Sequence, residues 1–207
     1  IFEAGRELKL VTGDGRVDDI RRSHLASLNV VQCSGSMTRL AQEMKRRWGI
    51  PFIRASFFGV EDTARALYDV ADHFKDRSLT EKASVIVAAG VERVREAVAA
   101  SRDRLKGKKA AIYVGGAFKA VSLVRCLRAL GMETALAGSQ TGGPEDYEHL
   151  AKVCGPKTVL VDDTNPAELG RLCRELGVDL LIGGVKERPI AAKLGLGFCD
   201  HNHERKI

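Results

Sequence analysis

The strongest constraint in this sequence is a regular alternation in its second half, where short apolar runs are separated by stretches with helical periodicity. The apolar runs occupy 110–114, 133–137, 158–161 and 180–182, and another begins at Phe198. Strands that are apolar throughout are buried on both faces, which is typical of a parallel sheet covered by helices on both sides. Residues 108–207 therefore predict a doubly wound, Rossmann-like α/β domain of four or five strands.

The first half repeats this alternation on a smaller scale. Strands are predicted at 8–11, 28–32 and 51–55, and helices at 36–48 and 61–74. A long stretch at 80–105 then predicts a helix, either continuous or broken near Gly90, whose valines indicate one buried face: Val85, Val87, Val91, Val94 and Val98. We expect a truncated first Rossmann-like domain at 1–78, a helical connector at 79–107 and a second Rossmann-like domain at 108–207.

Composition narrows the class of protein. With 207 residues, 44% hydrophobic and 29% charged, the chain has an ordinary globular balance that excludes a mainly disordered or fibrous protein. It contains no apolar run of about 18 residues, so we expect no membrane span. The net charge of +6 is spread among acidic residues, with no basic–aromatic ladder, which disfavours nucleic-acid binding but suits an anionic ligand.

Cysteine usage indicates a reduced, cytoplasmic protein. The five cysteines have irregular spacing and form no CxxC pair: Cys33, Cys126, Cys154, Cys173 and Cys199. The chain starts at Ile1 without a leader pattern, so we expect a fragment or a processed chain.

Ligands of open parallel sheets bind beyond the carboxyl ends of the strands. That rule selects the loops 12–16, 33–36, 115–119, 162–165 and 183–188. In the second of these, Cys33 precedes a predicted helix, whose amino terminus favours the thiolate needed by a nucleophile or an iron–sulfur ligand. A small buried residue at a tight turn explains Cys33 equally well, and both interpretations stay open.

The other loops carry weaker signals. Gly115–Lys119 could admit an anion at a helix terminus, but a close strand–helix turn is favoured. Asp162 and Asp163 could hold a metal, although helix capping by Thr164 or Asn165 before Pro166 explains more.

Two further segments near the carboxyl terminus hold chemistry-bearing side chains. Lys186 and Arg188 suit a carboxylate-rich ligand, with a solvated turn as the open alternative. Cys199, His201 and His203 would share one face of a strand, but their spacing is not that of a zinc site, so a dedicated metal site is disfavoured.

Several motifs, in order along nearly the whole chain, resemble the nitrogenase component-1 family, and within it the branch that builds the iron–molybdenum cofactor. The matching segments are TGDGR at 12–16, LNVVQCSGSM at 28–37, FFG at 57–59, VGGAFK at 114–119, AGSQTG at 137–142, VDDTNP at 161–166, GGVKERPI at 183–190 and FCDHNHERK at 198–206.

This resemblance implies a biosynthetic scaffold in an oxidoreductase superfamily, so enzymatic activity stays undecided. It implies a heterotetramer with a paralogous scaffold subunit, on which an iron–sulfur precursor of the cofactor matures with molybdenum and homocitrate. It also implies contacts with the nitrogenase Fe protein and with cluster-delivery proteins, in the cytoplasm and without nucleic acid or membrane.

The resemblance also suggests roles for single residues. Cys33 matches the family cysteine that ligates the cofactor or its precursor, and Lys186 matches a lysine near homocitrate. Asn202 replaces a metal-ligating histidine of the catalytic relative, which should weaken metal retention and suits a scaffold that releases its product. Lys119 and Arg188 are weaker candidates for the same basic wall.

The roles of His201 and His203, which flank Asn202, stay open. Two other functions stay open as well: a catalytic nitrogenase-type or tetrapyrrole reductase subunit, and a small-anion-binding Rossmann module that holds a phosphate at 115–119. A histidine at position 202 would favour the catalytic subunit, and a cofactor that does not depend on Cys33 would favour the tetrapyrrole reductase. Nucleotide binding without a response to iron and sulfide would favour the small-anion module.

Overall fold

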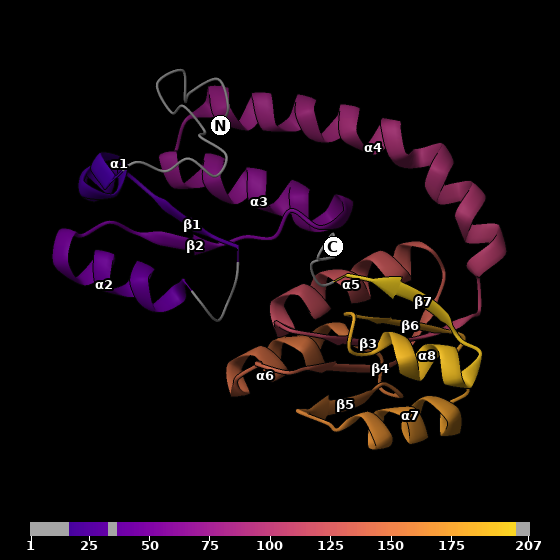
Figure 1. The fold of residues 1–207 in the computed structure, drawn as a ribbon. Helices are drawn as coiled ribbons and strands as arrows, with labels where there is room; N and C mark the ends of the chain where they lie inside the picture. Colours follow the sequence, from indigo (N-terminus) through magenta and orange to yellow (C-terminus); the bar gives the residue numbers. More distant parts are fainter. Residues whose placement is uncertain (1–16, 33–36, 202–207) are drawn as a thin grey trace.

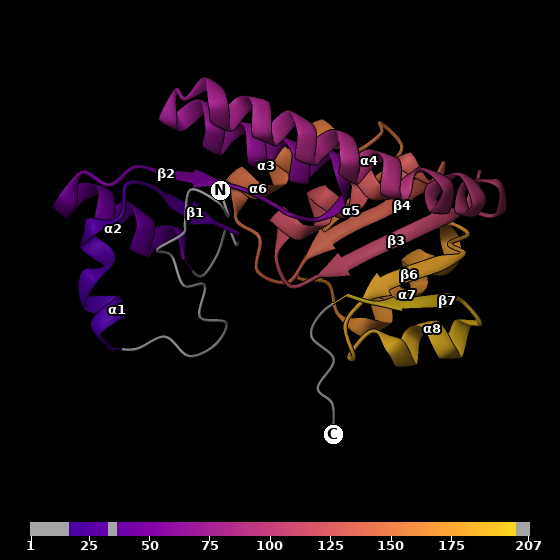
Figure 2. The ribbon, with the colours of Figure 1, turned by 90° about the horizontal axis from the view of Figure 1, so that it is seen from above.

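The computed structural model describes residues 17–32 and 37–201, which form two parallel sheets lying side by side (Figures 1 and 2). The first sheet has two strands, β1 (Asn29–Val31) and β2 (Phe52–Arg54). The second has five strands in the order β5-β4-β3-β6-β7. Every strand pair in both sheets is parallel, as the buried apolar runs predicted.

The second sheet is doubly wound, which confirms the predicted α/β class. Its strands are β3 (Lys109–Val114), β4 (Glu133–Ser139), β5 (Val159–Asp162), β6 (Leu180–Gly183) and β7 (Gly197–Asp200). The helices between them are α5 (Ala117–Ala129), α6 (Pro144–Val153), α7 (Pro166–Glu175) and α8 (Arg188–Leu194).

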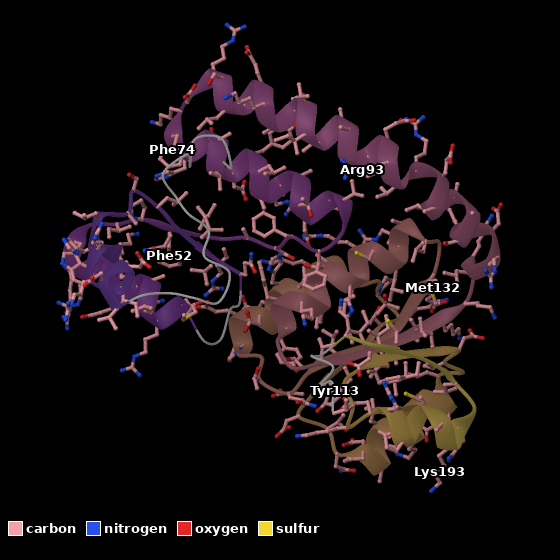
Figure 3. The ribbon with its side chains drawn as sticks, turned by 45° about the horizontal axis from the view of Figure 1, so that its top comes forward. Phe52, Phe74, Arg93, Tyr113, Met132 and Lys193 are labelled. Carbon is pink, nitrogen blue, oxygen red and sulfur yellow. The ribbon has the colours of Figure 1, made fainter. Side chains whose placement is uncertain are left out.

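Two apolar layers cover the faces of this sheet. Ile112 and Val114 pack against α5 and α6, where Leu150 is fully buried. Leu136 and Leu181 pack on the other face against α7 and α8, where Leu169 is buried. Burial of each such side chain contributes about 1.5–3 kcal/mol. Figure 3 shows the contrast between Tyr113, buried in this sheet, and Lys193, which points outward from α8.

Around the first sheet lie α1 (Val17–Arg22), the 3-10 helix η1 (Ser23–Leu25), α2 (Thr38–Trp48) and α3 (Gly59–Phe74). The periodic apolar residues of α2 are only partly buried. Ala41 and Met44 are 3% and 6% exposed, whereas Met37, Leu40 and Trp48 are all about half exposed. The predicted strand at 8–11 lies outside the described residues.

A single 29-residue helix, α4 (Arg77–Leu105), leads from the first sheet to the second, and it runs unbroken through Gly90 (Figure 1). The prediction of a buried valine face is wrong for Val85 and Val91, which are 70% and 37% exposed. The reason is geometric: α4 packs mainly against α3, Val91 lines a groove of about 360 Å³ between these two helices, and Val85 lies outside this groove. Within the described ranges, no helix is long and apolar enough to cross a membrane.

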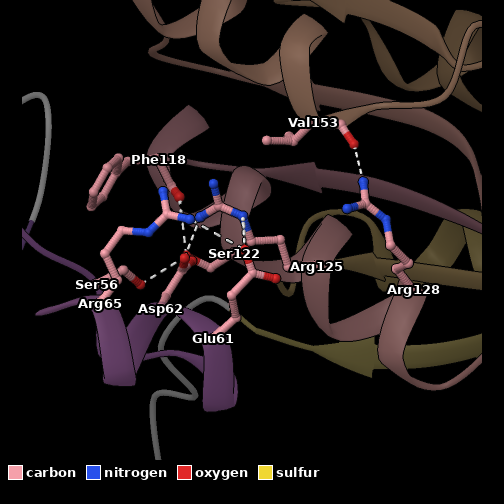
Figure 4. A network of polar contacts seen from close by, with 9 residues as sticks. All are labelled: Ser56, Glu61, Asp62, Arg65, Phe118, Ser122, Arg125, Arg128 and Val153. Atoms are coloured by element: carbon pink, nitrogen blue, oxygen red, sulfur yellow. Dashed lines mark hydrogen bonds and ion pairs between the residues drawn. The ribbon is translucent and has the colours of Figure 1, made fainter.

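Polar contacts join α3 to α5 and so tie the two sheets together (Figure 4). Arg125 of α5 binds Asp62 of α3, and it also lies 3.2 Å from the carboxylate of Glu61. The hydroxyl oxygens of Ser56 and Ser122 are 2.7 Å apart and both buried.

Candidate functional site

The second sheet has a topological switch point between β3 and β6. From β3 the chain winds through β4 to the β5 edge, and it then returns to β6 and continues to the β7 edge. The loop after β3 therefore leads into a helix on one face and the loop after β6 into a helix on the other. A crevice between such loops is where open α/β sheets bind ligands. Two of the five predicted loops, 115–119 and 183–188, are thus neighbours at this edge.

Lys119 joins three separate segments at this edge. Its Nζ donates a hydrogen bond of 2.8 Å to the carbonyl oxygen of His201, just after β7. It also lies 5.4 Å from the ring centroid of Phe58, in the loop between β2 and α3. The rings of Phe58 and His201 meet edge to face with centroids 5.0 Å apart. Lys119 therefore brings a positive charge to the place where the first sheet approaches the second.

His201 is held firmly and stays neutral at neutral pH. Its backbone N–H donates to the carbonyl oxygen of Gly183 at 2.8 Å. Burial, and then the nearby Lys119 ammonium, lower the pKa of His201, while Asp200 opposes this shift. Its Nε2 is buried and has no hydrogen-bond partner among the described residues.

The loop after β6 presents three consecutive charged residues in different ways. Lys186 is exposed, and within the described part of the chain it has no ion-pair or hydrogen-bond partner. Glu187 is only 5% exposed. Arg188 reaches β7, where its Nη2 lies 3.4 Å from Asp200 Oδ2 and its guanidinium 5.6 Å from the Phe198 ring centroid.

Lys119 and Arg188 thus contact two consecutive residues, His201 and Asp200, from different sides. The next residue in the chain is Asn202, which lies outside the described residues, as does Cys33, two residues after the end of β1. The structure brings Lys119 and Arg188 together at one edge, where they contact His201 and Asp200. The ligand-binding roles of Cys33, Lys119, Lys186, Arg188 and Asn202 stay predictions.

Hydrogen bonds link the carboxyl ends of β3, β4 and β5 at this edge. The Gly115 carbonyl oxygen accepts from the hydroxyls of Ser139, at 2.9 Å, and of Thr141. The Tyr147 hydroxyl lies 2.8 Å from the carbonyl oxygen of Val161, and burial raises the pKa of Tyr147 to about 12. This tyrosine therefore remains a protonated hydrogen-bond donor.

In the segment that follows Asp162 and Asp163, Asn165 caps α7, as favoured from the sequence. The Asn165 side chain accepts from the backbone N–H groups of Ala167 and Glu168, both at 3.0 Å, and Pro166 occupies the first helical turn. Nowhere in 17–32 or 37–201 do three His, Cys, Asp or Glu residues gather in a way that could hold a metal ion.

The four described cysteines are free thiols: Cys126, Cys154, Cys173 and Cys199. Burial raises the pKa of each of them, that of Cys173 to about 11. None is activated toward the thiolate form, so Cys33 remains the candidate ligand.

Sequence reasoning did not single out Glu187 or Phe58. An acidic residue between two cations looks like part of a solvated turn, and only tertiary packing reveals its burial. Conversely, a cavity of about 420 Å³ lined by Arg128, Cys154 and Lys157 opens beside the first residues of β4, at the amino edge of the sheet. It lies away from the carboxyl edge, where ligands of this architecture bind.

Comparisons with known proteins cover almost the whole chain. Residues 3–207 match the family model described as nitrogenase component 1 type oxidoreductase. The nitrogenase iron-molybdenum cofactor biosynthesis protein NifE of Clostridium pasteurianum is 50% identical over 95% of this chain and 43% of its own length. The NifE of Methanosarcina barkeri is 46% identical over 95% of this chain and 42% of its own.

Solved structures show the same fold. A structure titled "Nitrogenase Cp1 at pH 5" has a TM-score of 0.78 and 26% identity over 90% of this chain and 44% of that one. A second, titled "Nitrogenase Cp1 at pH 6.5", has a TM-score of 0.79 at 23% identity. The chain therefore spans less than half the length of the relatives it matches.

Proposed function

The chain belongs to the nitrogenase component 1 type oxidoreductase family, and on this premise we propose that it is part of a scaffold subunit for assembly of the iron–molybdenum cofactor. The observation that carries the proposal is the uncompensated cation at the switch point. Lys186 is exposed without a partner among the described residues, while Lys119 adds a second positive charge at the same edge. This edge suits an anionic ligand, and the names of the NifE relatives indicate which one.

In this proposal Cys33 ligates the iron–sulfur precursor, because it is the cysteine whose place in the sequence favours a thiolate. Lys186 binds the carboxylates of homocitrate as a point charge, while Lys119 and Arg188 form the basic wall of the pocket. In the same proposal Asn202 serves as a weak ligand for the molybdenum end, which allows the finished cofactor to leave. The two sheets enclose the cluster between them, which protects it from water.

The proposal includes the partners of the whole protein. The chain would pair with the paralogous subunit NifN in a heterotetramer, receive its precursor from cluster-delivery proteins and work with the nitrogenase Fe protein in the cytoplasm. Molybdenum and homocitrate enter during maturation. The chemistry belongs mainly to the cluster, while the protein binds and orients it.

A Rossmann module that holds a phosphate at 115–119 gains no backbone donor from Gly184 in the neighbouring loop after β6. The N–H of Gly184, a donor that could face a phosphate at the switch point, is already bonded to the Glu187 carboxylate at 2.7 Å.

The test is anaerobic reconstitution with iron and sulfide, beside the variants Cys33→Ala and Cys199→Ala. Cys199 is the matched control, because it is an exposed cysteine whose pKa is raised by burial. We expect iron content and visible absorption to fall to background in Cys33→Ala and to persist in Cys199→Ala. Equal iron uptake by all three proteins would contradict the assignment of Cys33.

A further inference from the structure

Glu187 has a position that the proposed function does not explain. It lies between Lys186 and Arg188, both exposed, yet its own side chain is turned inward and is 5% exposed. Burying a carboxylate is costly unless its oxygens are hydrogen-bonded. The contacts of Glu187 therefore show what this burial achieves.

Both carboxylate oxygens of Glu187 are bonded to the carboxyl edge of the sheet. Oε2 accepts from the backbone N–H of Gly184 at 2.7 Å, and Oε1 accepts from the side-chain amide of Gln140 at 3.1 Å. The backbone N–H of Glu187 in turn donates to the Gly184 carbonyl oxygen at 3.0 Å. The turn 184–187, with Lys186 in it, is thus closed by the backbone and by the side chain at once.

Gly183, the residue before this turn, leaves space for the buried side chain of Glu187. A Cβ on Gly183 would lie 2.8 Å from the Cβ of Glu187, a contact that real structures do not show. The second bond reaches further, because Gln140 follows β4 whereas Glu187 follows β6, and β3 lies between them. The Gln140–Glu187 bond therefore spans the end of β3 and ties the Lys186 loop to the centre of the sheet.

We propose that Glu187 is a positioning residue that fixes the place of Lys186 at the site, an inference that rests on the proposed function. The Glu187 carboxylate fixes the turn 184–187, and this keeps the Lys186 ammonium at the crevice and reduces its motion in solvent. Preorganisation of this kind raises affinity, because less motion is lost on binding. The ligand class that benefits is a polycarboxylate bound beside the cluster.

The conservative and the disruptive variants separate geometry from charge. In Glu187→Gln the new amide can still accept from Gly184, and the Gln140 amide can rotate to offer its oxygen to the new N–H₂ group. In Glu187→Ala both bonds are lost. Gln140→Leu removes only the bond across β3, and it serves as the second variant if Glu187→Ala does not fold.

The first measurement needs no ligand. Lysines are labelled by reductive ¹³C-methylation, and the signal of Lys186 is assigned with Lys186→Arg. We expect this signal to move in Glu187→Ala and in Gln140→Leu and to stay in place in Glu187→Gln. Glu175→Ala, at an exposed glutamate of α7, is the control. An unmoved Lys186 signal in both disruptive variants would overturn the proposal.

The second measurement uses citrate as a tricarboxylate probe on protein reconstituted with iron and sulfide. We expect citrate affinity to fall by about tenfold in Glu187→Ala, the size typical of lost outer-shell support, with iron content unchanged. Glu187→Gln should retain most of the affinity. Absence of iron uptake and of citrate binding in the unmodified protein would contradict the proposed function, whereas the Lys186 signal alone decides the role of Glu187.

Discussion

The contact between α3 and α5 depends on one buried ion pair, and its removal has a calculable effect. Asp62 is 5% exposed and the Arg125 side chain 10% exposed, whereas the second carboxylate partner, Glu61, is 55% exposed. Asp62 Oδ2 has no hydrogen-bond partner among the described residues, so Arg125 is the main compensation for this carboxylate. Losing Arg125 leaves a buried charge alone.

We expect Arg125→Met to destabilise the protein by about 3–5 kcal/mol, the cost of leaving one charge of a buried pair uncompensated. Asp62→Leu should cost less, about 1.5–3 kcal/mol, because Arg125 keeps the exposed Glu61 as a partner. The double variant should lose less than the sum, because an apolar pair can replace a buried ion pair at little net cost.

The assay is urea unfolding followed by circular dichroism, with Arg93→Met as the control, because Arg93 is an exposed arginine of α4 (Figure 3). A total stability of about 5–15 kcal/mol makes the expected loss easy to measure. A loss below about 1 kcal/mol in Arg125→Met, the size typical of an exposed pair, would refute the reasoning.

Three further predictions follow from single contacts. Cys173, fully buried with its pKa raised to about 11, should resist iodoacetamide until global unfolding, while the exposed Cys199 reacts in the native state, as mass spectrometry would show. Burial, and then the nearby Arg125, lower the pKa of His149. The contribution of neutral His149 to stability should therefore be present above pH 6.5 and be lost as the pH falls below that value. The variant His149→Gln should flatten the curve of stability against pH in this acidic range. Gly59→Ala should destabilise by about 1–3 kcal/mol, because its φ is +73° and a Cβ would lie 2.5 Å from Cys126 Sγ; Cys126→Ala should partly restore the melting temperature.

The second sheet could be predicted closely from the sequence because burial on both faces makes its strands apolar throughout. Ile112 and Leu136 pack on opposite faces, so their runs carry no polar alternation that could suggest a solvated surface. The start of α7 was predictable too, since Asn165 and Pro166 act through local capping. The valines of α4 could not be interpreted correctly, because periodicity does not reveal how much of a helix another element covers. The division of the whole chain at 78 and 107 stays a prediction.

Only the location of the site could be predicted from the sequence, because that location follows from a general rule for parallel sheets. Ligand binding at the carboxyl ends of strands selected the loops of Lys119 and Lys186, and the structure places these loops at one switch point. The inward turn of Glu187 could not be foreseen, because it depends on Gln140, 47 positions away in sequence. The roles of Cys33 and Asn202 stay predictions, since both lie outside the described residues.

Because α4 is long, a small change in its tilt moves the first sheet a large distance relative to the second. Its 29 residues span about 43 Å at 1.5 Å per residue. A tilt of about 5° at its carboxyl end would carry its other end, and α3 with it, through about 4 Å over that length. Such a displacement is longer than a hydrogen bond, so the Ser56–Ser122 and Asp62–Arg125 contacts would have to break before the helix could tilt this far. Loss of these two contacts would let the space between the sheets widen without unfolding either sheet.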